Sequence, residues 1–386
     1  MQLPEEYISF LETTFHINLR EPKAKDLKAI AQTVHRISEA LTRKKFREEF
    51  IKSTYMNDDV FRQAYLLYFT TCNLLKIFYP LSEIALSSFF EKKKDMKVLD
   101  LGSGTGTMIF GFSLWHDSWR QTSARQGGLE SLNFTACDQS QNALQELKQN
   151  FEKLCSAHKI ETHSADIETI TPLPQKFDLI TGANFLNEVS ETANSKVLEI
   201  LRQNLKDDGF AILIEPALIE TSRALLAFRD RALTTGLHVY SPCFTQKNCH
   251  ALIHAGDWCH HAMEWERPKF IEVIDKMVGN IKKSLKFSYI VLTKQDVHLG
   301  DFLFKERNFE TQFRVVSELF NEKGRKRIFL CNDLGRNSFI KNNRDDLKTN
   351  ESFDELKRYD VVEIKKFEVR KNDVQIQKES IVQRSI

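Results

Sequence analysis

Residues 97–106 read KVLDLGSGTG, where a short apolar run ends in Asp100 and continues directly into three closely spaced glycines. Glycine is needed where a backbone turns with positive φ or comes so close to a ligand that a Cβ would clash. The segment TMIFGFSLW that follows is compatible with a helix. The stretch therefore predicts a strand, a glycine turn and a helix that begins at the turn, a unit typical of nucleotide-binding α/β folds.

Apolar runs alternate with amphipathic stretches over the middle of the chain. We expect strands at 97–101, 133–138, 159–165, 177–182 and 210–216, and later ones at 287–293, 325–331 and 360–369. Strands that alternate with helices imply a parallel sheet with helices on both faces. Residues 1–90 instead have apolar side chains at three- and four-residue spacing, which predicts helices.

The length and composition allow more than one domain. With 386 residues and 41% hydrophobic side chains, the chain can bury a full-sized core. We expect a helical N-terminal region over 1–90, a Rossmann-like domain over 91–331 with a Cys-rich insertion over 238–267, and a charged β-rich C-terminal extension over 332–386.

The glycine spacing indicates the class of ligand. Dinucleotide sites use G-x-G-x-x-G, whereas only one residue separates the second and third glycines here. Together with an acid before the first glycine, this favours a ligand that has an amino-acid moiety and no pyrophosphate. We therefore expect S-adenosylmethionine to contact this turn, through Asp100, Gly102, Ser103, Gly104 and Gly106.

Two further acids follow neighbouring strands of the same expected sheet. Asp138 ends the second strand, where a carboxylate can accept from both ribose hydroxyls, and Asp166 follows the third, where it can accept from the adenine amino group. Asn184 follows the fourth strand at the same edge. Each acid alone is more often an ordinary turn residue, but three after successive strands favour a class I S-adenosylmethionine-dependent methyltransferase fold.

The seven cysteines fall into two groups. Three lie in apolar patterns, where a buried thiol is ordinary packing: Cys72, Cys137 and Cys155. Three more crowd into the irregular segment SPCFTQKNCHALIHAGDWCHH, namely Cys243, Cys249 and Cys259. Cys331, at the end of an expected strand, can complete a four-cysteine metal site.

The cysteine spacing alone leaves this metal site undecided. It matches neither the C-x₂-C pairs of zinc ribbons nor the common ferredoxin runs. Unrelated thiols therefore remain an alternative, and four thiolates suit either Zn²⁺ or an iron–sulfur cluster. The neighbouring histidines are alternative ligands, at positions 250, 254, 260 and 261.

The order of motifs DLGSGTG, LIEP, SPCFTQKNC, DWCHH, KFSYIVL and IFLCNDLGR resembles the methyltransferase-like assembly factors of the mitochondrial small ribosomal subunit and their bacterial relatives. The resemblance extends from about Tyr65 to Arg336. It implies small-subunit ribosomal RNA as the partner. It also implies a [4Fe–4S] cluster held by Cys243, Cys249, Cys259 and Cys331.

Two departures bear on this resemblance and on the chemistry. Phe244 and Thr245 follow the first cysteine, where the family has proline and histidine. The Asn/Asp-Pro-Pro-aromatic turn of many amino-group methyltransferases is also missing after the fourth strand, where residues 183–186 read ANFL, and no cysteine nucleophile stands there. Three functions stay open: an rRNA methyltransferase, a non-catalytic assembly factor that keeps the cofactor fold, and a small-molecule or protein methyltransferase with a zinc site.

The net charge and the targeting signals exclude few classes of binding partner. The formal net charge is +2, from 55 basic and 53 acidic residues, so any RNA contact must come from local clusters. Such clusters occur at 43–45, 282–283 and 323–327, although each can equally be a solvated face. With no signal-like start and no apolar run long enough for a membrane span, we expect a cytoplasmic protein with reduced thiols and no membrane or DNA partner.

Overall fold

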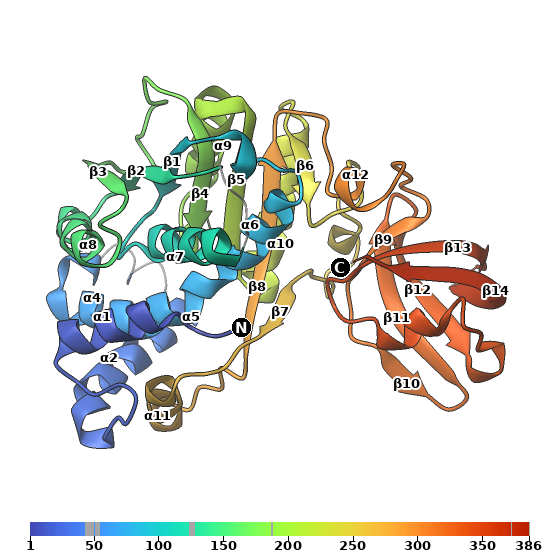
Figure 1. Ribbon diagram of the computed structural model, residues 1–386, viewed down its shortest axis with the longest axis horizontal. Coiled ribbons are helices and arrows are strands. Elements are labelled where there is room, and N and C mark those ends of the chain that lie inside the picture. The colour runs from blue at the N-terminus through green and yellow to red at the C-terminus, as the bar shows by residue number, and fades with distance from the viewer. Residues whose placement is uncertain (43–49, 51–54, 123–127, 187, 372, 386) are drawn as a thin grey trace. The chain divides into compact units, whose positions relative to one another are not determined.

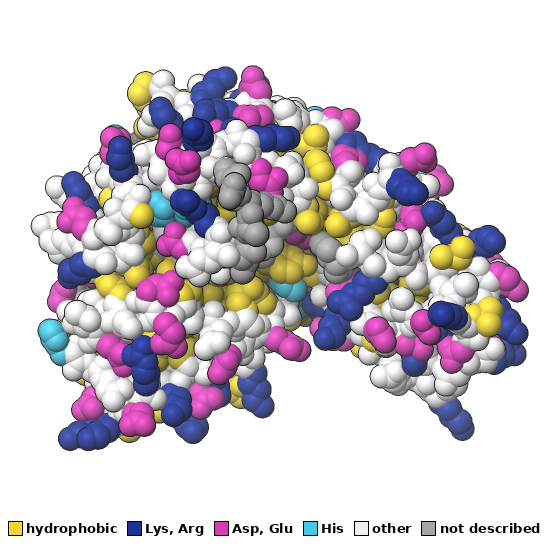
Figure 2. All heavy atoms as spheres, viewed as in Figure 1, with side chains coloured by type: hydrophobic (Ala, Val, Ile, Leu, Met, Phe, Trp, Pro, Cys, Tyr) yellow, Lys and Arg dark blue, Asp and Glu magenta, His cyan; other side chains and the backbone are white. Residues whose placement is uncertain are grey.

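The computed structural model describes residues 1–386 except 43–49, 51–54, 123–127, 187, 372 and 386 (Figure 1). The chain forms two compact units. The first comprises Met1–Glu215 and Met263–Lys286, and the second comprises Pro216–Ala262 and Phe287–Ile386. Among the described residues, no helix combines the length and the apolar character needed to cross a membrane. On the face drawn in Figure 2, basic side chains are interspersed with acidic ones, in keeping with the small net charge.

The first unit begins with helical segments, as predicted for residues 1–90. They are α1 (Glu5–Phe15), α2 (Ala24–Thr42), η1 (Tyr55–Asn57), α4 (Asp59–Ala64), η2 (Tyr65–Thr70), α5 (Thr71–Asn73), η3 (Leu74–Ile77), α6 (Phe78–Ala85) and η4 (Phe90–Lys92). The predicted apolar face of α2 is buried, since Leu27, Val34 and Ile37 are 0% exposed. Pro80 lies in the first turn of α6, where its missing N–H removes no helical hydrogen bond.

A parallel sheet forms the core of the first unit. Its strands are β1 (Asp95–Leu101), β2 (Ser131–Asp138), β3 (Lys159–Ser164), β4 (Phe177–Ala183) and β5 (Leu205–Pro216), in the order β3-β2-β1-β4-β5. The helices that connect or flank them are α7 (Thr107–Thr122), α8 (Gln141–Leu154), α9 (Glu191–Asn204) and α11 (Lys269–Val278). The prediction of a class I methyltransferase-type Rossmann-like fold is confirmed.

The strand order determines where a ligand can bind. The order reverses between β1 and β4, and open α/β sheets bind ligands outside the carboxyl ends of the strands at such a reversal. The register aligns the strand ends there, because Leu101 pairs with Cys137 on one side and with Gly182 on the other. Residues that follow these three strands therefore meet at one edge.

The second unit contains a closed β-barrel. Its helices and strands are α10 (Ile219–Leu233), β6 (His238–Ser241), η5 (His250–Leu252), α12 (Gly300–Leu303), β9 (Gln312–Val315), β10 (Phe320–Glu322), β11 (Arg325–Asn332), β12 (Gly335–Asn342), η6 (Asn343–Asp345), η7 (Glu351–Glu355), β13 (Val361–Val369) and β14 (Val374–Arg384). The strands β7 (His261–Glu264) and β8 (Ser284–Thr293) begin in one unit and end in the other. Strand β8 pairs antiparallel with β6.

The barrel closes because the short strand β9 pairs with β13 on one side and with β11 on the other. The sheet order is β10-β11-β12-β14-β13-β9, and β9 pairs again with β11 (Figure 1). Buried side chains such as Phe313, Leu330 and Ile364 fill the interior. The expected extension over 332–386 starts too late, since its boundary falls inside the β11–β12 hairpin and the barrel begins at Gln312. The strands β9 and β10 are too short for an alternation of apolar and polar residues to be recognised in the sequence.

Candidate functional site

A cavity of about 420 Å³ opens at the carboxyl edge of the parallel sheet, within the first unit. All of the residues predicted to contact the cofactor line it except Gly106, namely Asp100, Gly102, Ser103, Gly104, Asp138, Asp166 and Asn184. Residues from the ends of β1, β2 and β4 and from the segment after β3 are thus brought together. The strand register described above accounts for this convergence.

The glycine turn adopts the backbone conformations that its sequence predicts. Gly102, Gly104 and Gly106 have φ values of 66°, 48° and 91°, which side-chain-bearing residues rarely adopt. A Cβ on Gly106 would lie 2.2 Å from the Leu147 side chain of α8. Gly106 therefore permits α7 to start close to α8, which explains why it supports the cavity without lining it.

Asp100 is a buried carboxyl group at the end of β1. It is 1% exposed, and the Thr181 hydroxyl of β4 donates to its Oδ1 at 2.7 Å. Burial raises the pKa of Asp100 to about 7, although the hydrogen bonds from Thr181 and Ser103 oppose the shift. A cationic group in the cavity would stabilise the ionised form, so this carboxyl suits the ammonium end of an amino-acid-like ligand.

Asp138 connects the end of β2 to the glycine turn. The amide of Gly104 donates to its Oδ2 and the amide of Ser140 to its Oδ1, both at 2.8 Å. Burial raises the pKa of Asp138, and these amide hydrogen bonds counteract the shift. Each carboxylate oxygen has a second lone pair, so Asp138 can still accept from the two hydroxyls of a ribose.

The two remaining predicted residues differ in how firmly they are held. Asp166 is exposed, and its Oδ1 accepts from the amide of Glu168 at 2.9 Å. Asn184 has a φ of 59°. The two amides that follow it, of Phe185 and Leu186, both donate to Oε1 of the buried Glu215, at 3.1 and 3.0 Å. Glu215 thereby holds the turn after β4 in place through these two hydrogen bonds.

The N-terminal helical region contributes a wall of the cavity that our sequence reasoning missed. Tyr55, Met56, Asn57 and Tyr65 line the cavity, and the Ser140 hydroxyl donates to Asn57 Oδ1 at 2.7 Å. Burial raises the pKa of both tyrosines, so their phenols are neutral near pH 7. Tyr65 begins the π-helix η2, a local irregularity that is frequent at functional sites. No spacing in the sequence indicates that these residues reach the turn.

The four cysteines predicted as metal ligands lie together within the second unit. Cys331 interacts electrostatically with the other three thiols, and Cys249 interacts with those of Cys243 and Cys259. All four are free thiols. Burial raises the pKa of Cys249 to about 12 and also raises the pKa of Cys259 and of Cys331. A bound metal would deprotonate such thiols outright.

Buried basic groups make this region suitable for an anionic metal centre. Arg229 is 0% exposed and interacts with the thiols of Cys243 and Cys249. Its Nη1 and Nη2 donate to the carbonyls of Lys247 and Thr245, at 2.7 and 2.5 Å, which holds the loop between these cysteines. Its Nε is buried and has no hydrogen-bond partner within the described part of the chain. Its charge is already paired with Asp230, whose Oδ1 lies 2.5 Å from Nη1, so an anionic cluster would add an acceptor for this Nε donor only.

The four sulfur atoms are not already gathered around one tetrahedral zinc position. Four sulfurs at about 2.3 Å from one tetrahedral Zn²⁺ lie roughly 3.8 Å apart. Among the described residues, no three of these sulfurs lie within 4.8 Å of one another. A [4Fe–4S] cluster holds its cysteines farther apart, because each binds a different iron. The donor set, four cysteine thiols, is one that either kind of metal centre can use.

Residues 92–272 match the family model that is described as a methyltransferase domain. Among curated proteins, none matches this chain. The matched stretch contains the glycine turn and the three cofactor acids. Most of the cavity lining therefore lies in the stretch that is similar to methyltransferase domains.

Several solved structures are similar to part of the chain. A TehB-like S-adenosylmethionine-dependent methyltransferase from Corynebacterium glutamicum is 17% identical, with 55% of this chain and 87% of that one covered and a TM-score of 0.32. An S-adenosylmethionine-dependent methyltransferase from Aquifex aeolicus is also 17% identical, with coverages of 54% and 88% and a TM-score of 0.31. The glycopeptide N-methyltransferase MtfA in complex with S-adenosylmethionine is 10% identical, with coverages of 55% and 87% and a TM-score of 0.33.

Proposed function

We propose that this protein binds S-adenosylmethionine in the cavity of its first unit, carries a [4Fe–4S] cluster on its four clustered cysteines, and acts on the RNA of the small ribosomal subunit. The observation that carries the cofactor assignment is the convergence of Asp100, Asp138 and the glycine turn on one cavity of a methyltransferase domain. The cluster and the RNA partner are supported by the family resemblance, and the cluster also by the gathering of the four thiols near the partnerless Nε of the buried Arg229.

Each cavity residue has a distinct role in this proposal. The backbone of Gly102–Gly104 allows the cofactor to approach closely, Asp100 pairs with its ammonium group, and Asp138 accepts from the ribose hydroxyls. Asp166 accepts from the adenine amino group at the exposed end. The bound cofactor supplies the methyl group, and the protein has to hold an acceptor in line with it.

One observation favours a second candidate, an assembly factor that binds the cofactor without transferring its methyl group. Phe185 occupies the turn after β4, where many amino-group methyltransferases have a polar Pro-Pro turn. Its side chain packs against both Gly102 and Gly182, where an added Cβ would lie 3.1 Å and 2.4 Å from it. The polar side chains that line the cavity include those of Asn184, Glu188, Tyr55 and Tyr65.

The basic clusters noted in the sequence give the RNA assignment little support by themselves. Residues 43–45 lie outside the described part of the chain. In the cluster at 323–327, Arg325 and Arg327 pair with Glu322, and Lys326 pairs with Asp354. The RNA partner therefore rests chiefly on the resemblance.

Labelled methyl transfer to isolated small subunits tests the proposal. Full-length protein is incubated with methyl-labelled S-adenosylmethionine and bacterial 30S particles, with Asp138→Asn as the matched variant impaired in cofactor binding. Label in rRNA that depends on Asp138 establishes an rRNA methyltransferase. Co-sedimentation and cofactor binding without label establish the assembly factor. Label found only in small molecules or proteins, from a colourless protein that contains zinc, would overturn the proposal in favour of the third function.

A further inference from the structure

The strand connectivity of the barrel is that of an oligonucleotide-binding fold. With β9, β11, β12, β13 and β14 taken as strands one to five, the pairing order is 1-2-3-5-4 and closes from 4 back to 1. Strands three and five, β12 and β14, are parallel, while the other pairs are antiparallel. Five-stranded Greek-key barrels of this kind bind oligonucleotides or oligosaccharides on the face of strands two and three and on the adjoining loops.

That face carries aromatic rings interleaved with guanidinium groups. Phe329 of β11 points outward, since Ile328 and Leu330 on either side of it are buried in the barrel. The Arg327 guanidinium lies 4.8 Å from the ring centre of Phe320 and 5.4 Å from that of Phe329. Arg336 of β12 lies 5.4 Å from the Phe329 ring. Phe320, which is 41% exposed, lies in the connection between strands one and two.

The charge on this surface is positive despite its ion pairs. Glu322 accepts from both Arg325 and Arg327, each at 2.7 Å, so one carboxylate is shared between two guanidinium groups. Lys323 in the same hairpin is exposed. Single-stranded nucleic acids are held by such combinations, because bases stack on aromatic rings and phosphates pair with cations.

We propose that the face formed by Phe320, Arg325, Arg327 and Phe329 binds single-stranded RNA. The proposal deepens the RNA partner of the proposed function and rests on it, but it is independent of methyl transfer. Base stacking on Phe320 and phosphate contacts from Arg325 and Arg327 would give binding with little sequence preference.

Anisotropy titrations of a labelled, mixed-sequence single-stranded RNA test this proposal with the full-length protein. Phe320→Ala should weaken binding by about tenfold at constant charge. Arg325→Ala should lower the slope of log Kd against log salt by about one. Lys378→Ala removes an exposed positive charge elsewhere on the barrel and is the matched control, expected to bind as the wild type.

The outcomes separate this face from the proposed function. If Phe320→Ala and Arg325→Ala bind RNA as well as the wild type does, the RNA-binding face has been assigned wrongly. The proposal that the protein binds RNA is then unaffected. Equal affinity for duplex RNA would also overturn the stacking proposal. If the wild type binds S-adenosylmethionine but neither single-stranded RNA nor 30S particles, both this face and the RNA part of the proposed function fail.

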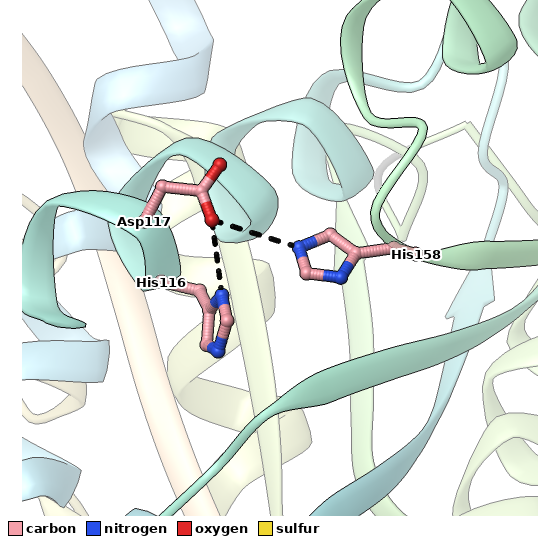
Figure 3. A group of neighbouring side chains, drawn as sticks. All are labelled: His116, Asp117 and His158. Carbon is pink, nitrogen blue, oxygen red and sulfur yellow. Dashed lines mark hydrogen bonds and ion pairs between the residues drawn. The ribbon is translucent and has the colours of Figure 1, made fainter. Parts of the chain in front are cut away.

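A second inference comes from a separate cluster in the first unit, where Asp117 lies between two buried histidines (Figure 3). His116 and Asp117 belong to the last turns of α7, and His158 immediately precedes β3. Helix α7 starts at the carboxyl edge of the sheet, and His158 lies at the amino edge, so this cluster lies away from the cofactor cavity. The three ligand atoms lie within 4.8 Å of one another.

The hydrogen bonds of His116 orient the lone pair of its Nδ1 toward the carboxylate of Asp117. Its Nε2 lies 3.0 Å from the carbonyl oxygen of Leu129 and must donate to it, which leaves Nδ1 facing Asp117 Oδ1 at 3.2 Å. A lone pair that faces a carboxylate oxygen is repulsive unless a proton or a metal cation lies between them. Metal-bound histidines typically donate their other ring N–H to a backbone carbonyl in this way.

The second histidine completes the arrangement. Nε2 of His158 is buried, has no hydrogen-bond partner among the described residues, and lies 3.9 Å from the same Asp117 oxygen. The Leu132 amide donates to Nδ1 at 3.4 Å, a long hydrogen bond that metal binding at Nε2 would break, because the ring proton would then move to Nδ1. Asp117 is 47% exposed, which leaves a coordination position open to water.

We infer that His116, Asp117 and His158 bind a divalent transition-metal ion that clamps the end of α7 to the start of β3. Two imidazoles and a carboxylate are suitable ligands for such an ion, with water in the open position. The test is the zinc content of full-length protein after stripping with chelator and dialysis against buffered Zn²⁺. The wild type should retain one zinc ion more per chain than Asp117→Asn and His158→Gln.

The control for this experiment is His163→Gln, which replaces an exposed histidine of β3, the strand that follows His158, and should match the wild type. Because the four cysteines are unchanged in every variant, any zinc that they bind cancels in the comparison. Asp117→Asn replaces a half-exposed side chain and should fold, which circular dichroism checks. Equal zinc in folded wild type and Asp117→Asn would show that a proton occupies the gap, and would overturn the metal site.

Discussion

The cofactor cavity and the four-cysteine site are assembled in opposite ways. The cavity is made of short segments, each at the end of a strand, that hydrogen-bond to one another through backbone amides, as Gly104 does to Asp138. The cysteine site takes three thiols from one irregular loop and the fourth, Cys331, from a barrel strand. Its loop is held by a buried cation, Arg229, rather than by regular strand pairing.

This difference shows what each site depends on. The cavity depends on backbone conformations that only particular residues allow, so its geometry exists before any ligand binds. The cysteine site gathers four thiols beside a buried guanidinium, and in our proposal its geometry depends on the metal centre that the thiols would bind. Substitutions should therefore affect the two sites separately, and the following predictions test that separation from the largest expected effect to the smallest.

Cys331→Ser should abolish the cluster while leaving the cofactor cavity intact. Loss of one thiolate leaves one iron without its protein ligand, and Cys331 is the ligand that joins the barrel to the loop. We expect anaerobically purified wild type to be brown and the variant to lose the visible iron–sulfur absorbance almost completely. Titration calorimetry with S-adenosylmethionine should give the same affinity for both proteins; a parallel loss of cofactor binding would contradict the separation of the two sites.

Gly106→Ala should destabilise the protein by about 2–5 kcal/mol. The positive φ costs an alanine about 1–2 kcal/mol, and the clash with Leu147 adds about 1–3 kcal/mol. Gly236→Ala is the matched control, because Gly236 also has a positive φ, 86°, but no atom lies within 4 Å of an added Cβ. Urea denaturation measures both. Equal losses in the two variants would show that close packing at the turn is unimportant.

The same contrast, between strand ends and a loop that is joined to a distant strand, explains how much of each site could be predicted from the sequence. The glycine turn and the acids after β1 to β3 were predicted because each is local to a strand end, and the parallel sheet then fixes their convergence. Tyr55 and Tyr65 were missed because only tertiary packing brings the N-terminal helices to the turn. Likewise, spacing could not join Cys331 to a distant loop. The barrel was placed too late because its closure depends on pairing between β9 and β11.

Asp138→Ala should weaken the binding of S-adenosylmethionine by about 100-fold, since hydrogen bonds to a charged group contribute about 1.5–3 kcal/mol each. The visible absorbance of the cluster should be unchanged. Asp138→Asn keeps one oxygen that can accept from the amides of Gly104 and Ser140. Comparing it with Asp138→Ala therefore distinguishes the loss of contacts to the ribose from the loosening of the glycine turn. If the asparagine variant bound as tightly as the wild type, the carboxylate would have no direct contact with the cofactor.

The smallest expected effect is a pH dependence of cofactor binding that originates in Asp100. With a pKa of about 7, this carboxyl is half protonated at pH 7 and mostly protonated at pH 6. The ammonium of the cofactor pairs with the ionised form, so binding must release a proton, and affinity should fall by about fivefold from pH 7 to pH 6.

Asp100→Asn should bind more weakly and lose this dependence, whereas Asp166→Asn, at the exposed adenine end, should retain it. A wild-type affinity that is flat over this range would mean that Asp100 only supports the glycine turn, and the ammonium would then have to be held by the backbone of the turn alone.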